Sequence, residues 1–213
     1  MANLKRLGGI FLVGAAAAAV VGLSVAPAFA GVAKATWTIK PGGTTGANAG
    51  KTVLKDTNTG NSLSCSSSMA TAVLKSGSGL SGSAAGKITA ISFTNCIGPA
   101  GITFTVTPGH LPWHLNLVSF NSTTGVTTGS ITGIHATLSG ASCSAVVDGA
   151  TSATSNNGKV KATYTNSTHQ LKVSGGNLHL YNVSGCFGLI NSGDATTFTG
   201  TYTLTVPQTI TSP

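Results

Sequence analysis

Apolar and polar residues alternate with a period of two along most of the chain, which is the pattern of β-strands that bury one face. In residues 102–107, Phe104 and Val106 point one way while three threonines point the other. Residues 159–165 and 201–206 repeat this alternation. Beyond the N-terminal segment, no stretch shows a helical period, so we expect strands throughout.

Turn-forming sequences rich in Gly, Asn and Pro separate the strand patterns, as in Pro41-Gly42-Gly43 and Asp148-Gly149. Further strands are predicted at 36–40, 70–75, 87–93, 113–120, 130–138, 144–147, 170–173 and 178–183. Residues 44–62 are weakly patterned, and we expect a long loop or an irregular edge there. Many short strands with frequent turns indicate an all-β, antiparallel sandwich or barrel-like fold.

The N-terminal segment has the features of a secretory signal peptide. Lys5 and Arg6 precede a long apolar run, and Ala28-Phe29-Ala30 supplies small residues at the expected cleavage site. We therefore predict a signal peptide at 1–30 and a secreted β domain at 31–213, without stable membrane insertion after cleavage. An uncleaved anchor is the alternative, because the apolar run approaches the length of a membrane span.

An even number of cysteines in an exported chain indicates disulfides. The four cysteines are Cys65, Cys96, Cys143 and Cys186. A diverged internal repeat selects among the three possible pairings. Ser-Cys-Ser occurs at 64–66 and again at 142–144, and each is followed by similar Gly-Lys and Thr-rich segments in the same order. Pseudo-repeat halves at about 31–125 and 126–213 predict the bridges Cys65 to Cys96 and Cys143 to Cys186.

The charge balance excludes one large class of partner. The predicted mature region has nine lysines against three aspartates, no glutamate and no arginine. Without arginine there is no bidentate group for phosphates or base edges, and the lysines are scattered, so nucleic-acid binding is not expected. A surface of Ser, Thr, Asn and Gly is compatible with association with neutral polymers.

Motifs for metal binding or catalysis are weak. His110 and His114 frame Pro112, which is incompatible with a helix interior, and on a strand two histidines at this spacing stand roughly 13 Å apart. The loop that starts at Asp56 lacks the ligands of a calcium loop, and all three aspartates lie in turn sequences, where they cap backbone N–H groups. We therefore predict no metal, no cofactor and no catalytic residue, and expect a protein that is not an enzyme.

Exposed aromatic side chains are the usual platform for carbohydrates. Trp113, Tyr164 and Tyr202 fall on inward positions of their predicted strands. Tyr181 and the neighbouring His179 are outward if Leu178 and Leu180 face the core. Tyr181 and His179 are therefore the predicted binding residues.

Several segments together resemble uncharacterised secreted β-rich proteins of actinobacteria: Trp37 to Gly43, Pro112 to Asn116, Gly133 to Ala136 and Gly200 to Pro207. This resemblance covers most of the predicted mature chain. It implies export from a bacterium with a thick wall, and it transfers no known activity and no site residue.

The sequence thus favours a secreted, noncatalytic β module that associates with a cell-surface or neutral, carbohydrate-like polymer; it does not set the oligomeric state. The alternatives are an extracellular carrier of a small apolar ligand and a secreted inhibitor. A polymer-binding module predicts outward aromatic side chains on one face. A carrier predicts an apolar internal cavity, and an enzyme predicts a histidine close to Asp or Ser in a cleft.

Overall fold

The computed structural model describes residues 35–213, in which β-strands are joined by turns and one short 3-10 segment, η1 (Pro99–Gly101). The first strands are β1 (Thr36–Lys40), β2 (Gly43–Ala49), β3 (Thr52–Asp56), β4 (Ser62–Leu74), β5 (Gly77–Ser81), β6 (Gly86–Ile97), β7 (Thr103–Gly109) and β8 (Trp113–Asn121). The remaining strands are β9 (Val126–Gly140), β10 (Ser144–Gly149), β11 (Gly158–Thr165), β12 (Gln170–Ser174), β13 (Leu178–Ser184), β14 (Ala195–Leu204) and β15 (Thr209–Thr211).

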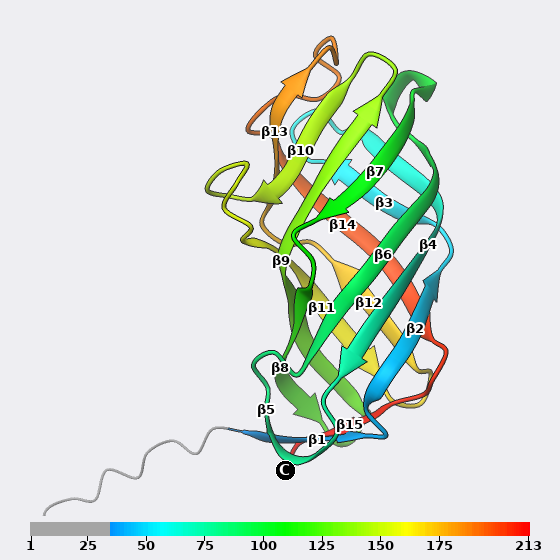
Figure 1. Cartoon of the computed structure of the whole chain (residues 1–213), viewed down its shortest axis with the longest axis vertical. Helices are drawn as coiled ribbons and strands as arrows, with labels where there is room; N and C mark the ends of the chain where they lie inside the picture. The colour runs from blue at the N-terminus through cyan, green and yellow to red at the C-terminus, as the bar shows by residue number, and fades with distance from the viewer. Residues whose placement is uncertain (1–34) are drawn as a thin grey trace, which may run out of the picture. The chain divides into compact units, whose positions relative to one another are not determined.

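Most of these strands form one closed antiparallel barrel, shown in Figure 1. Four long strands, β4, β6, β9 and β14, extend along the barrel. Every other strand of the wall is short, and two short strands together fill the place of one long strand. One circuit runs β4, β6, β7, β9, β10, β13, β14, β3 and back to β4, and the other runs β4, β6, β8, β9, β11, β12, β14, β2 and back to β4. Because both circuits close, the barrel wall has no free edge strand.

Closure depends on the last long strand meeting the first two strands of the wall. In β14, Tyr202 is paired with Ala49 of β2, and Phe198 is paired with Leu54 of β3. The two predicted halves therefore contribute to one barrel, not to two sheets packed face to face. The all-β prediction is confirmed, and the barrel-like form is the one that the chain adopts.

A separate three-stranded sheet lies across one end of the barrel. Its order is β15, β1, β5, and Ile39 of β1 is paired with Ile210 of β15. Trp37, Ile39 and Ile210 are buried against the last barrel residues, including Leu74 and Tyr164. We call this sheet the plug and the barrel end that it covers the plug end. The opposite end, which carries the β3–β4, β6–β7, β9–β10 and β13–β14 connections, is the loop end.

Both predicted disulfides are present. Cys65 of β4 faces Cys96 of β6 on the neighbouring strand, and Cys143 is bonded to Cys186 across the start of β10 and the end of β13. No cysteine in residues 35–213 is free. Both bridges lie in the half of the barrel that contains the loop end.

The predicted loop at 44–62 is wrong. Residues 43–49 and 52–56 form β2 and β3, which complete the barrel wall. Their inward positions are small or weakly apolar, such as Thr45, Ala47 and Ala49, so the alternation is hard to recognise from hydropathy. Pairing with β4 and β14 on both sides makes strands of these residues in spite of low intrinsic β propensity.

The predicted signal peptide at 1–30 lies outside the described residues. Within residues 35–213, no helix is long and apolar enough to cross a membrane.

Candidate functional site

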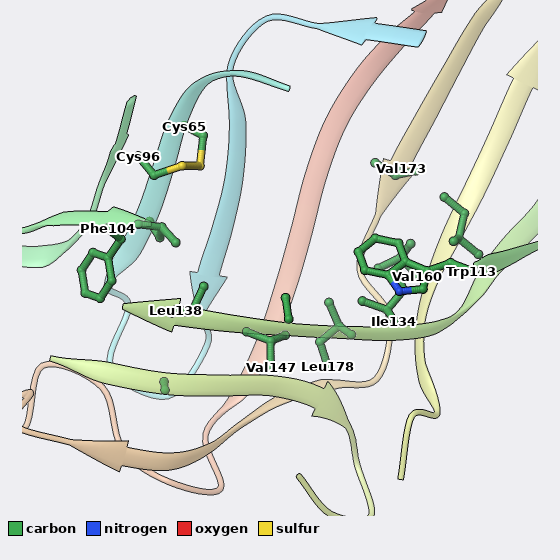
Figure 2. Packing of buried hydrophobic residues seen from close by; sticks show 14 of the residues in the cluster. Cys65, Cys96, Phe104, Trp113, Ile134, Leu138, Val147, Val160, Val173 and Leu178 are labelled. Carbon is green, nitrogen blue, oxygen red and sulfur yellow. A yellow bond between two sulfur atoms is a disulfide. The ribbon is translucent and has the colours of Figure 1, made fainter. Parts of the chain in front are cut away.

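The barrel interior contains an apolar cavity of about 140 Å³. Its wall includes Leu138 and Val147 towards the loop end, Trp113 near the middle, and Leu117 and Ile210 towards the plug end. Figure 2 shows how side chains from several strands converge on the interior, with Trp113 and Val160 close together. The atoms that line the cavity are almost all carbon.

The cavity exists because many inward positions carry small residues. An eight-stranded barrel is just wide enough for ordinary side chains to fill it. Here Ala47, Ala72, Ala136 and Ala162 are buried and line the cavity, each from a different strand. These short side chains leave space that the larger neighbours do not fill. A cavity of about 150 Å³ with an aliphatic and aromatic lining stays dry and binds small apolar molecules such as benzene.

The polar ends of the large interior side chains are bonded to the wall or the plug. Tyr202 places its hydroxyl 2.9 Å from the hydroxyl of Ser68, and Tyr164 donates to the carbonyl of Gln208 at 2.7 Å. Trp113 Nε1 donates to the carbonyl of Gly109 at 3.0 Å. Burial raises the pKa of both tyrosines, so both stay neutral at ordinary pH. These residues therefore present apolar ring faces, and no ionised group, to the cavity.

The plug closes the cavity at one end. Trp37 and Ile39 of β1 are almost fully buried, and Ile210 of β15 lines the cavity directly. A side chain at Gly82 would overlap Trp37, because an added Cβ would lie 2.6 Å from the indole Nε1. A side chain at this position would therefore displace the tryptophan. Gln208, also buried, accepts a hydrogen bond from the backbone N–H of Gly42 at 2.9 Å and ties β15 to the start of β2.

The two predicted binding residues lie on the outer face of β13, away from the cavity. Leu178 and Leu180 are buried, as predicted, and His179 and Tyr181 are partly exposed. The Tyr181 hydroxyl donates to the carbonyl of Gly149 at 2.8 Å, so the ring is held against the neighbouring segment. Burial, and after it the charge of Asp148, raise the pKa of Tyr181. The role of both residues in binding stays a prediction.

Aromatic side chains do not gather on the outer surface in the way that a stacking platform requires. Trp37, Trp113, Tyr164 and Tyr202 are all buried. Among the large apolar residues that the described part exposes, Phe187 is the one aromatic. It lies on the β13–β14 connection, apart from Tyr181 of β13. Aromatic residues in this barrel therefore serve the interior.

All three aspartates cap backbone N–H groups, as predicted. Asp56 accepts from Asn58 and Thr59, and Asp194 accepts from Asn191. All three side chains are buried, so none is available on the surface as a free carboxylate. Their role in the fold is to order turns.

Asp148 has a partner that sequence reasoning missed. Its Oδ2 lies 3.0 Å from Nδ1 of His135. His135 lies on the outer face of β9, between the buried Ile134 and Ala136, and its pairing with Asp148 depends on the register of β9 with β10. The hydroxyl of Ser155 bonds to Asp148 and not to the imidazole, so these three residues do not form the relay of a serine hydrolase.

The two histidines of the His-x3-His sequence lie on different segments and do not form a pair. His114 is on β8, whereas His110 lies in the β7–β8 connection with its ring against His135. Within residues 35–213, no group of three or more His, Cys, Asp or Glu side chains is arranged around a common point where a metal ion could bind.

The chain matches the model of a known protein family. The model of the family described as "Alkane oxidation protein activator PraA/PraB-like" matches residues 9–212, which is most of the chain. No individually curated protein matches the chain. No solved structure matches it either. The family description names an activator and not an enzyme.

Proposed function

Because the chain belongs to the PraA/PraB-like family of alkane oxidation protein activators, we propose that it is a noncatalytic, extracytoplasmic protein that binds small hydrocarbons inside its barrel. The cavity of about 140 Å³, with its almost purely carbon lining, carries this proposal. A small apolar molecule that enters such a cavity leaves water without losing any hydrogen bond. The activating role then consists of holding a poorly soluble hydrocarbon for an oxidation system elsewhere.

The chemistry of the wall supports an uncharged ligand. Tyr164 and Tyr202 are neutral, and the three aspartates lie outside the cavity lining. A fatty acid would place its carboxylate in this lining without a cation to pair it, which costs several kcal/mol. An alkane or a similarly apolar molecule is therefore the class of ligand that fits.

Two disulfides support an extracytoplasmic location, because such bonds persist in oxidising compartments. The expected signal peptide agrees with that location. Association with a neutral polymer, which the sequence favoured, concerns the outer surface and is compatible with a ligand inside. Tyr181 and His179 remain the predicted residues for this association.

The experiment is a binding titration of the oxidised chain with a series of n-alkanes, measured by headspace partition and by displacement of an apolar fluorophore. We expect saturable binding with one site per chain and an upper limit on alkane length. Absence of saturable binding across the series would contradict the proposal.

Filling the cavity provides the matched test. Ala72→Leu and Ala162→Leu together add apolar volume inside the barrel, and both alanines line the cavity. We expect alkane binding to fall at least tenfold while the melting temperature is unchanged or raised. Ala90→Leu is the control, because Ala90 is exposed on the outer face of β6. Equal loss in the control, or undiminished binding in the filled barrel, would place the ligand outside the cavity.

A further inference from the structure

The outer face of the barrel carries an ordered polar cluster around Asp148 that the hydrocarbon cavity does not use. Asp148 has a relative exposure of 0%, although it points outward, because residues 150–157 fold over it. Its two oxygens accept from the N–H groups of Gly149, Asn156 and Asn157 and from the Ser155 hydroxyl. The carboxylate is thereby fixed in one orientation.

This carboxylate determines which nitrogen of His135 carries the proton. Asp148 Oδ2 lies 3.0 Å from His135 Nδ1, so a neutral His135 ring has its proton on Nδ1 and its lone pair on Nε2. Nε2 makes no hydrogen bond within residues 35–213, and the side chain keeps 14% of its exposure. A carboxylate bonded to one imidazole nitrogen, with the other nitrogen free, is the arrangement that orients and strengthens histidine as a metal ligand.

A second imidazole lies beside the first. The ring centroids of His110 and His135 are 4.6 Å apart, and the ring planes meet at 89°. His110 is exposed and makes no side-chain hydrogen bond within the described residues, and its φ of 54° is a conformation that residues other than glycine rarely adopt.

The residue before His110 leaves the space that this contact needs. A Cβ at Gly109 would lie 2.8 Å from Cδ2 of His135 and 3.6 Å from its Nε2. The Cδ2–Nε2 edge of His135 therefore lies over Gly109, on the side of the β7–β8 connection from which His110 projects. The free nitrogen of His135 is thus on the ring edge that lies over Gly109, the residue directly before His110.

We propose that His110 and His135 form a site for a divalent transition-metal ion of the class that prefers imidazole, such as Zn²⁺ or Cu²⁺, with Asp148 as the positioning residue. Imidazole is a favoured ligand of both ions. With metal–nitrogen bonds of about 2.0–2.1 Å, two imidazoles on one ion have centroids roughly 4.5–5.2 Å apart, and the observed separation lies in that interval. Water or a group from another molecule supplies the other ligands, so the site is open.

The experiment is a Zn²⁺ titration of the oxidised chain, followed by the ring ¹⁵N signals of all histidines. We expect saturable one-to-one binding, with large shifts confined to the Nε2 of His135 and one nitrogen of His110. No saturable binding, or shifts spread evenly over the five histidines, would overturn the proposal.

Two variants locate the ion. His110→Asn retains a residue that tolerates a positive φ and should weaken Zn²⁺ binding at least tenfold. His114→Asn is the control, because His114 is also exposed but lies on β8, and it should bind Zn²⁺ as the unchanged chain does. Equal weakening by both substitutions would show nonspecific surface binding and overturn the proposal.

The role of Asp148 needs a separate readout. Asp148→Asn should weaken binding about 10–100-fold, as loss of a carboxylate behind a metal-bound imidazole does. It should also move the His135 proton between the two ring nitrogens in the metal-free chain, which ¹⁵N shifts report. If the Asp148 variant fails to fold, the His110 and His114 pair still decides the proposal. Unchanged Zn²⁺ affinity in a folded Asp148 variant would remove Asp148 from the site.

Discussion

The two ends of the barrel are closed by different means. The loop half contains both disulfides and the three buried aspartates, so covalent bonds and capped turns hold its connections together. The plug end is covered by β1, β5 and β15, which are held there by apolar packing and hydrogen bonds. Figure 1 shows the three plug strands below the barrel wall.

This difference indicates how a molecule reaches the cavity. Opening the loop half requires a disulfide to break or several turn hydrogen bonds to be lost together. Opening the plug end requires a three-residue strand, β15, and its neighbour β1 to separate from the wall. The plug strands carry no covalent cross-link to the wall, so a local opening can separate them at a lower free energy than global unfolding. We therefore expect ligands to enter and leave at the plug.

The strongest test of this comparison is removal of the main plug side chain. Trp37→Ala should lower the free energy of unfolding by about 3–5 kcal/mol, as loss of a buried large aromatic does. It should also accelerate exchange of a bound alkane, because the plug no longer fills the end of the cavity. Denaturant unfolding and stopped-flow displacement measure the two effects. Slower or unchanged exchange in a folded variant would place the entrance elsewhere.

Removal of the loop-end bridge is the corresponding change at the other end. Cys143→Ala with Cys186→Ala should cost about 3–4 kcal/mol, because the bridge spans a sequence separation of 43 residues. Alkane exchange should stay close to that of the unchanged chain, measured below the unfolding transition. An acceleration as large as that caused by Trp37→Ala would show that the two ends do not differ in the way we infer.

As the pH is lowered, the loop half should lose stability before the plug does. Burial disfavours the charged form of Asp148, but hydrogen bonds from His135 and from the backbone N–H groups of Gly149, Asn156 and Asn157 outweigh it and lower its pKa below 3.8. A carboxyl whose pKa is lower in the folded chain contributes stability above its unfolded pKa and loses it as the pH falls through the folded value. We expect this contribution to be about 1–3 kcal/mol near neutral pH and to be lost as the pH falls through the folded pKa of Asp148.

Hydrogen exchange of the oxidised chain between pH 2 and 5, corrected for the intrinsic rate, measures this effect. Protection of β10 and residues 150–157 should decrease with acid, whereas that of β1 and β15 should not. Asp148→Asn should remove the pH dependence in β10. A parallel loss of protection in both regions would contradict the assignment to Asp148.

The smallest expected effect is on stability when Tyr181 is removed. Tyr181→Ala deletes a partly exposed ring with one hydrogen bond and should cost about 1 kcal/mol, without changing alkane binding. It tests the polymer association predicted from the sequence, by cosedimentation with peptidoglycan, chitin and cellulose. Retention that persists in moderate salt and weakens in this variant would support that prediction, and retention on none of them would contradict it.

Local features of this protein were predictable from its sequence. Phe104, Tyr164 and Tyr202 are buried as their alternating patterns indicated, because successive residues of a regular strand point to opposite faces. The disulfide partners followed from the internal repeat. The aspartates cap turns, since their side chains reach only nearby N–H groups.

Features that join distant segments were not predictable. The pairing of His110 with His135 and Asp148 depends on the registers among β7, β9 and β10, and no sequence spacing encodes it. The plug was missed because β5 and β15 are short, and β5 is mostly Gly and Ser. The sequence allowed a carrier of a small apolar ligand as an alternative function. It did not show the cavity for such a ligand, which exists only in the folded barrel.

The sequence by itself determined an all-β chain and its inward and outward faces, because these depend on residue type and local periodicity, and its two disulfides, because the internal repeat selects the pairing. The tertiary structure decided that the sheet closes as a barrel, that small residues from different strands line one interior and leave a cavity, and that β1 and β15 cover its end. The physical reason is that closure and cavity volume depend on which distant strands pair and in what register. A period of two fixes the face of each side chain but leaves its partner undetermined.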